Sequence, residues 1–195
     1  MKKVICSAIV AIFVIGAMSS CKKALEVVKK VFPPQEFDLP TVLTDPIPAI
    51  TFPIPRNTDF DLPPVEQRIN VDSIIRVNTG NNFGAGDISS IKLKQITLKI
   101  VEGYDAQNNF SNFNHARFSF SSTTNNNKIN IANATFSAAD AASDTKVIPT
   151  PDAPELRSYL SSTNADKLYY TVTASVSRYT TQPMRFSIVA RLAMK

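Results

Sequence analysis

Apolar and polar residues alternate with a period of two along much of the second half of the chain. The alternation is clearest in 168–177 and 184–194, where every second residue is apolar. Because successive side chains of a β-strand point to opposite faces, this period indicates strands with one buried face. The short link 180–183 predicts that these two strands form a hairpin.

Shorter segments with the same period precede this pair, at 69–77, 91–101, 116–120, 129–136 and 147–148. The apolar parity changes near Lys94 and Gln95, which predicts a β-bulge, and 129–136 repeats such a change. About seven short strands with one apolar face each predict an all-β domain over 65–195, built as an antiparallel two-sheet sandwich. A small closed β-barrel is the alternative.

Residues 33–64 contain nine of the thirteen prolines. Proline lacks a backbone N–H and fixes φ, which excludes helices and central strands from this stretch. The stretch also holds too many apolar residues for a free linker, and Ile50, Phe52 and Ile54 alternate at strand period. We expect an extended arm whose pieces lie as edge strands against the domain. Asp59 and Asp61 are expected to be solvated, with a calcium site as the alternative.

Residues 1–20 have the form of a signal peptide, with two lysines before the apolar stretch 4–18. That stretch is shorter than the roughly 20 apolar residues that span a bilayer. The residues Met18-Ser19-Ser20-Cys21 resemble the lipobox of bacterial lipoproteins. The resemblance implies cleavage before Cys21, lipid on its thiol and acylation of the new amino terminus, with no other cofactor. An ordinary secretory peptide is the alternative.

Residues 21–32 follow the predicted cleavage point and hold the lysines Lys22, Lys23, Lys29 and Lys30 among apolar residues. As a helix this segment would be basic and amphipathic, and we expect these lysines to contact an anionic membrane surface. A soluble spacer is the alternative. Without Lys2 and Lys3 the formal charge falls from +5 to +3, and the basic residues are scattered, which argues against a nucleic-acid partner.

Candidate binding residues lie in one loop and on the last strands. The loop 78–87 holds three of the five glycines but lacks phosphate-loop spacing, so we expect it to join two strands and present Asn81, Asn82 and Phe83. Tyr170 shares the parity of the buried residues, whereas Tyr169 and Tyr179 are expected to be exposed. Exposed tyrosines can stack on sugars or peptides. A helical turn at 154–160 is expected to close one open end.

Two cysteines and one histidine leave little material for catalysis or metal binding, so no catalytic residue and no metal site is predicted. His115 is expected to be an ordinary polar residue at the start of a strand. The asparagine runs 108–109 and 125–127 are expected to form turns.

Asp72-Ser73-Ile74 resembles the acceptor sequence for O-linked glycans on exported Bacteroidota proteins, which implies a glycan on Ser73. With the lipobox and the proline-rich arm, the chain resembles the small β-sandwich lipoproteins of those bacteria. In that group an acidic cluster after the cysteine accompanies surface display. Lys22 and Lys23 stand there instead, so we expect an outer-membrane lipoprotein that faces the periplasm.

The expected function is therefore a non-catalytic binding or scaffolding module for an envelope protein or polysaccharide. The alternative is a periplasmic carrier of a lipid or other apolar ligand, which requires a hollow interior.

Overall fold

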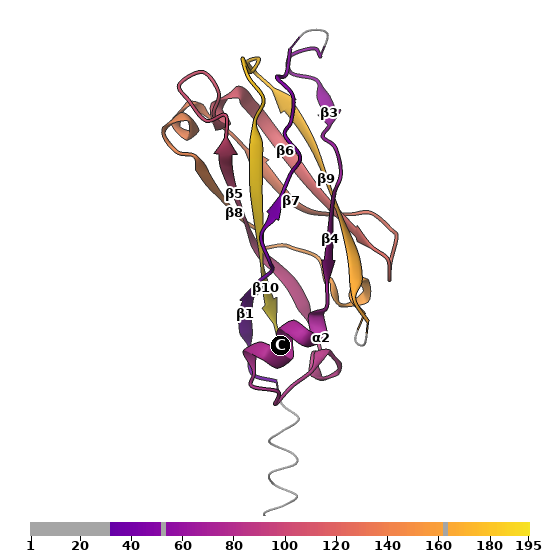
Figure 1. Cartoon of the computed structure of the whole chain (residues 1–195). Helices are drawn as coiled ribbons and strands as arrows, with labels where there is room; N and C mark the ends of the chain where they lie inside the picture. The colour runs from indigo at the N-terminus through magenta and orange to yellow at the C-terminus, as the bar shows by residue number, and fades with distance from the viewer. Residues whose placement is uncertain (1–31, 52–53, 162–163) are drawn as a thin grey trace, which may run out of the picture.

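The computed structural model describes residues 32–51, 54–161 and 164–195, which form a sandwich of two antiparallel β-sheets (Figure 1). The predicted sandwich is confirmed, and the described strands form two open sheets rather than a closed barrel. Cys21 and the lysines Lys22, Lys23, Lys29 and Lys30 lie outside the described residues. Among the described residues, no helix has the length and apolar content needed to cross a bilayer.

Ten strands are present in the described residues, five in each sheet. The first sheet has the order β1-β10-β5-β8, with β2 also on β10, and its strands are β1 (Gln35–Asp38), β2 (Val42–Leu43), β5 (Ile91–Glu102), β8 (Thr145–Pro149) and β10 (Arg185–Met194). The second sheet has the order β3-β9-β6-β7, with β4 also on β9, and its strands are β3 (Asp59–Asp61), β4 (Val65–Ile69), β6 (Phe113–Ser122), β7 (Ile129–Thr135) and β9 (Asp166–Val176).

The proline-rich arm forms edge strands on both sheets, as its composition predicts. It pairs β1 and β2 with β10 and then crosses to the second sheet, where β3 pairs with β9. Along the way the Ile50 amide donates to the Thr180 hydroxyl at 2.7 Å. The Gln67 side chain of β4 donates to the Pro40 carbonyl at 2.7 Å, which ties the two sheets together on this side. The arm is thus part of the sandwich.

The predicted hairpin of the last two strands is wrong. β9 lies in the second sheet, between β6 and the strands β3 and β4, whereas β10 lies in the first sheet, between β5 and the strands β1 and β2. Facing sheets are about 10 Å apart, a gap that the link 177–184 easily spans. Alternation shows which face of a strand is buried but not which strand pairs with it, and both strands bury their apolar face in the shared core.

The predicted strand at 69–77 is also wrong. β4 ends at Ile69, and the chain continues as the helix α2 (Val71–Asn78). The Asn70 side chain caps this helix by accepting from the Ser73 amide at 2.9 Å. Val71 and Ile75 share the buried face because they are four residues apart. The apolar residues Val71 and Ile75 fit either period, being four residues apart, and the cap decides for the helix.

Both predicted phase changes are confirmed. Arg191 pairs with Gln95 and Leu192 with Leu93, so Lys94 is the extra residue of a bulge in β5. The register between β6 and β7 skips Ile131 in the same way. The expected helical turn at 154–160 is shorter in the structure, a 3₁₀ turn over Arg157–Tyr159.

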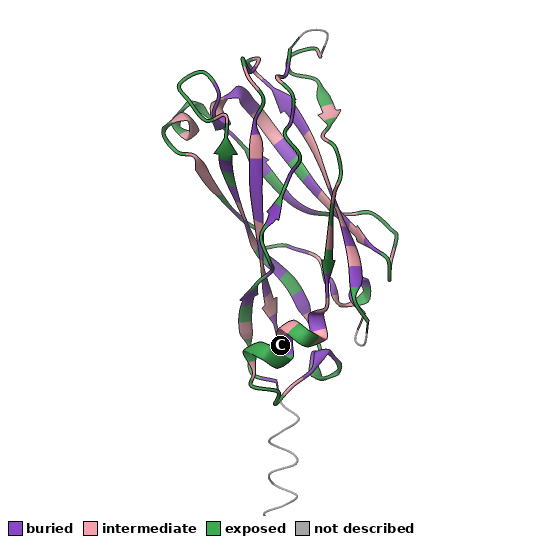
Figure 2. Cartoon of the chain, viewed as in Figure 1, coloured by how far each residue is buried: buried purple, intermediate pink, exposed green. Residues whose placement is uncertain are grey.

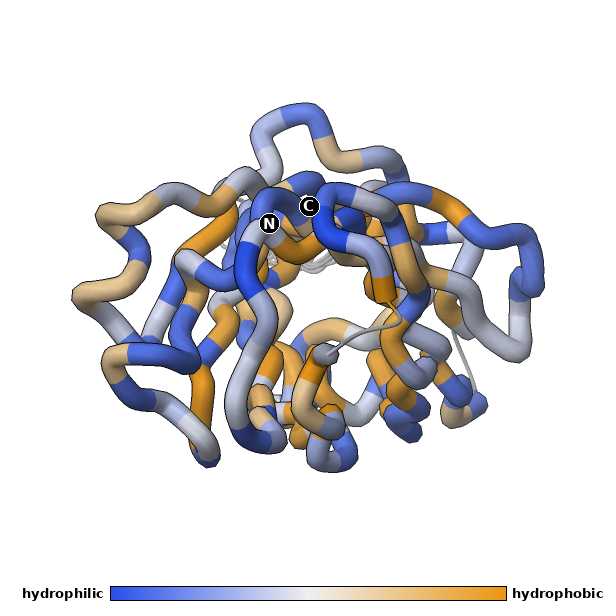
Figure 3. Tube along the Cα trace, turned by 90° about the horizontal axis from the view of Figure 1, so that it is seen from above, coloured by the Kyte–Doolittle hydropathy of each residue, from blue (hydrophilic) through white to orange (hydrophobic). Residues whose placement is uncertain are grey.

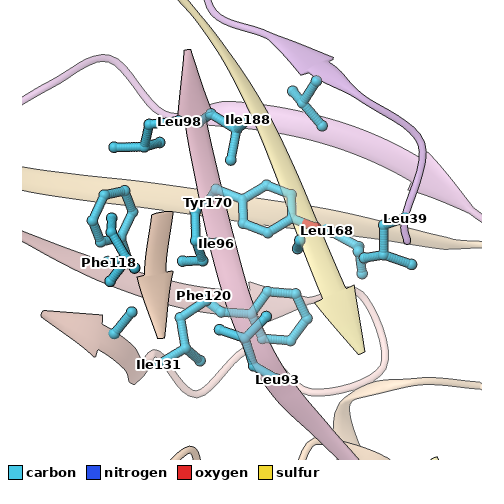
Figure 4. Close-up of a cluster of buried hydrophobic side chains, with 14 of the residues drawn as sticks. Leu39, Leu93, Ile96, Leu98, Phe118, Phe120, Ile131, Leu168, Tyr170 and Ile188 are labelled. Carbon is cyan, nitrogen blue, oxygen red and sulfur yellow. The ribbon is translucent and has the colours of Figure 1, made fainter. Parts of the chain in front are cut away.

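The core lies between the two sheets and is filled by side chains from both. Buried residues alternate with exposed ones along the strands of both sheets (Figure 2). Viewed from above, the hydrophobic residues of the strands and the hydrophilic loops around them can be followed along the trace (Figure 3). Leu98 and Ile188 of the first sheet face Phe118 and Tyr170 of the second (Figure 4). Burial raises the pKa of Tyr170, whose hydroxyl donates to the Gln67 side chain at 3.0 Å.

Candidate functional site

The outer face of the second sheet is lined by hydroxyl, amide and charged side chains. Residues that pair directly across neighbouring strands point to the same face, and each row of this sheet is polar on its outer side. We call this surface the polar face and define it by Tyr169, Thr171 and Thr173 of β9, Arg117, Ser119 and Ser121 of β6, and Asn130 and Asn133 of β7, each exposed or half-buried.

The rows of the polar face place hydrogen-bonding groups side by side, and Asn130 donates to Asn133 at 3.1 Å. Ser119 pairs with Thr171 on one side and with Asn130 on the other. The hydroxyls of Ser119 and Thr171 make no side-chain hydrogen bond to another described residue. In the next row Arg117 stands between Thr173 and Asn133. Hydroxyl and amide groups both donate and accept, so these rows offer a two-dimensional array for a polar ligand.

One end of the polar face carries a cluster of charges. The Asp59 carboxylate of β3 lies 2.8 Å from His115 Nε2 and 3.7 Å from a terminal nitrogen of Arg117. Ser175, between Asp59 and His115 in the register, is buried beneath them. Beside the cluster, an open depression of about 590 Å³ is lined by residues 114–117 of β6 and 133–136 at the end of β7. Its size suits a small polar ligand or part of a chain.

The described residues do not gather the ligands of a metal site. Asp59 contacts His115 and Arg117, and Asp61 instead accepts from the Thr173 hydroxyl at 2.6 Å. No group of three or more histidine, cysteine or acidic side chains that could hold a metal ion occurs in the described part of the chain.

The predicted loop residues lie at the α2 end of the molecule. Asn81 and Asn82 are exposed, and Phe83 is half-buried with its ring packed edge-on against Phe32 at 5.3 Å. The loop joins α2 to β5, which corrects the expectation that it joins two strands. Positive φ at Gly80 and Asn81 turns the chain away from the helix.

The two predicted tyrosines are separated from that loop and from each other. Tyr169 is half-buried on the polar face and pairs with Glu66 and Ser121. Tyr179 follows β9 in the 177–184 link, at the end of the sandwich away from α2 (Figure 1). It is half-buried rather than exposed, and its hydroxyl donates to the Ile54 carbonyl at 3.1 Å. The structure therefore does not unite the predicted residues in one site.

Ser73, the predicted glycan acceptor, is exposed in the first turn of α2. Its amide is occupied by the Asn70 cap. The side chain of Val77 lies one turn further along the same helix.

The asparagines at 108–112 do more than the turn formation that the sequence predicts. Asn108, Asn109 and Asn112 are fully buried. The Asn108 side chain donates to the Thr181 hydroxyl at 2.8 Å and accepts from the Thr181 amide at 2.6 Å. The Asn112 side chain donates to the Tyr179 carbonyl at 2.9 Å. These bonds fasten the loop before β6 to the 177–184 link.

The interior offers little space for a ligand. One apolar cavity of about 50 Å³ lies among Phe110, Phe118 and Phe186, and another of about 20 Å³ lies near Phe120 and Leu168. An apolar cavity that binds benzene has a volume of roughly 150 Å³. Neither space is large enough for an acyl chain.

Comparisons with known proteins leave the family open. No family model matches the chain, and no curated protein matches it either. A solved structure titled Desmodium yellow mottle tymovirus is similar over 84% of this chain and 89% of its own, at 12% identity and a TM-score of 0.21. A likeness at that score carries no argument about fold or function.

Proposed function

We propose that the chain is a membrane-anchored envelope lipoprotein whose sandwich is a non-catalytic module that binds polysaccharide on the polar face. The observation that supports this most is the row of Thr171, Ser119 and Asn130, which aligns polar groups across three strands. A sugar chain presents hydroxyls at regular intervals, and such an array can hydrogen-bond several of them at once. Tyr169, beside this row, offers a half-exposed ring on which a sugar can stack.

A polysaccharide fits the polar face better than a protein does. Protein interfaces centre on buried aromatic, methionine or arginine anchors within an apolar patch. The residues of the polar face include one aromatic ring, Tyr169, and no aliphatic side chain. The filled core favours a surface-binding module over a carrier of apolar ligands, because the interior cavities are too small for an acyl chain.

Binding is tested with the Cys21→Ser chain and polysaccharide fractions purified from the envelope of the producing bacterium. Arg117→Ala and Tyr169→Ala are each expected to weaken binding about tenfold in calorimetric titration, since each removes one contact worth roughly 1–2 kcal/mol. Lys99→Ala, on the outer face of the first sheet, is the matched control and leaves Kd unchanged. Equal loss in all three variants, or binding of envelope protein alone, would contradict the proposal.

The anchor is tested by cell fractionation. Phe32, the first described residue, stands eleven positions after Cys21, so a lipid on Cys21 would hold the sandwich next to the membrane. The wild-type chain is expected in the outer-membrane fraction and Cys21→Ser in the soluble periplasmic fraction. Retention of Cys21→Ser on the membrane would contradict the lipid anchor.

A further inference from the structure

The amino-terminal end of the sandwich carries an exposed apolar residue beside the point where the chain leaves for its anchor. Val77, on the outer side of α2, is 76% exposed, the largest value among the large hydrophobic residues exposed in the described chain. The α2–β5 loop brings Phe83 against Phe32 at 5.3 Å. Phe32, where the described chain begins, therefore lies at the same end of the molecule as α2 (Figure 1).

Positive charge without an ion-pair partner lies at this end too. Lys92 and Lys195 are exposed and line one groove of about 360 Å³, and neither forms a salt bridge with another described residue. The groove also holds Glu36, which pairs with Lys94 at 3.4 Å, and Glu155 attracts Lys92 from nearby. The groove adjoins the α2–β5 loop, because the amides of Ser89 and Ser90 both donate to the Lys195 carbonyl. Basic side chains near an anionic membrane surface are attracted to it.

The acidic side chains near α2 already have partners within the fold. Asp72 accepts from Arg76 at 2.6 Å and from the Ala85 amide at 2.8 Å. Asp87 accepts from the Gly84 amide at 2.8 Å. Because these two carboxylates are already hydrogen-bonded within the fold, they repel an anionic membrane surface less strongly than free carboxylates would.

The length of the tether keeps this end close to a bilayer. Eleven residue steps from Cys21 to Phe32 reach at most about 40 Å even when fully extended. A contact that is weak in free solution becomes populated when a short tether holds its two partners together. This step rests on the lipid anchor of the proposed function.

We infer that the α2 end of the sandwich rests on the bilayer surface, with Val77 at the headgroup boundary and Lys92 and Lys195 facing lipid phosphates. In this orientation the strands rise away from the membrane. The polar face then stands roughly perpendicular to the bilayer, accessible to a polysaccharide.

The chain contains no tryptophan, so single-tryptophan variants report the contact without background. Val77→Trp places the probe on α2, and Val147→Trp, at a position 50% exposed on β8, is the matched control. Both are purified as the lipidated full chain and incorporated into vesicles of phosphatidylethanolamine and phosphatidylglycerol with a brominated acyl chain. Val77→Trp is expected to shift its emission to shorter wavelength and to lose most of its intensity, whereas Val147→Trp keeps both.

Each other outcome has a distinct meaning. Quenching of Val147→Trp with Val77→Trp unaffected overturns the inference, because the sandwich would then lie on its first sheet. Quenching of neither probe, in protein that floats with the vesicles, overturns it as well and leaves the anchor intact. Failure of the wild-type chain to float overturns the lipid anchor itself. Val77→Asp, which alters an exposed position, is expected to keep the unfolding midpoint and to restore full intensity to a Phe83→Trp probe on the neighbouring α2–β5 loop.

Discussion

The two open ends of the sandwich are covered in different ways. At the end away from α2, the buried side chains of Asn108, Asn109 and Asn112 hydrogen-bond to the surrounding loops. At the α2 end, a capped helix covers the strands while Val77 and two lysines stay available. One end is closed by the protein's own polar groups, whereas the other keeps groups for something outside the chain. The difference predicts that equivalent substitutions are costly at the first end and mild at the second.

The largest contrast is expected between two glycines. Gly103 has φ +80°, and a Cβ there would lie 2.2 Å from the Pro183 carbonyl oxygen, so Gly103→Ala combines backbone strain with a clash. We expect it to cost about 3 kcal/mol or more of the free energy of unfolding. Gly86, near α2, has open space around its Cβ position, and Gly86→Ala should stay within about 1 kcal/mol of wild type. Equal losses in urea unfolding would remove the contrast between the ends.

Asn108→Ala is expected to cost about 2–3 kcal/mol, because it empties a fully buried position and removes both side-chain hydrogen bonds to Thr181. Asn126, exposed in the predicted asparagine turn at 125–127, provides the control. Asn126→Ala should change the free energy of unfolding by less than about 0.5 kcal/mol. Chemical denaturation of both variants measures the difference, and a comparable loss at Asn126 would show that burial of the asparagines is not what matters.

At the α2 end, loss of a side-chain hydrogen bond is expected to lower the free energy of unfolding by less. Asn70→Ala removes the side-chain cap of α2 and should destabilise the protein by about 1 kcal/mol. Asn70→Asp, which also accepts from the Ser73 amide, should retain most of the stability. Thermal unfolding of the two variants separates loss of the cap from any other effect of the position, and equal destabilisation would argue against capping.

The smallest effect concerns pH. The hydrogen bonds from Arg76 and from the Ala85 amide lower the pKa of Asp72 below its ordinary value. A carboxyl with a lowered folded-state pKa stabilises the protein above its unfolded pKa, and this stabilisation is lost as the pH falls through the folded value. Asp72→Asn should therefore cost a few tenths of a kcal/mol at pH 7 and nothing at about pH 2. A cost that persists at low pH would contradict the ionic origin.

The glycan that the sequence implies on Ser73 and the membrane contact inferred for α2 exclude each other. A glycan on Ser73, one turn before Val77, would stand between α2 and a membrane. If α2 rests on the bilayer, the intact mass of the purified chain shows no glycan on Ser73. A glycosylated Ser73 would support the Bacteroidota resemblance and would contradict the membrane contact.

The sequence predicted the buried faces well and the partners of the strands poorly. Period-two alternation located β5 to β10 and both bulges, because each inward residue must be apolar whatever strand lies beside it. It could not show that β9 and β10 belong to different sheets, since both present an apolar face to the same core. It predicts a strand where α2 forms, because Val71 and Ile75 fit both periods and only the Asn70 cap distinguishes them.

The candidate site was less predictable than the fold. Tyr169 was recognised from its parity, but the alignment of Ser119, Thr171 and Asn130 depends on a register between strands far apart in the sequence. The pairing of His115 with Asp59 joins residues 56 positions apart, a distance over which no local pattern applies. The sequence predicts only turns at the buried asparagines, because burial of a polar side chain depends on a partner elsewhere in the chain.

The tether on Cys21 underlies both the proposed function and the orientation of the α2 end. Mass spectrometry of the amino-terminal peptide from membrane-extracted protein tests it most directly. We predict a peptide that begins at Cys21 and carries a diacylglyceryl group on sulfur together with an acylated amino group. A peptide that still contains residues 1–20, or a mature chain with a free Cys21 thiol, would contradict the account.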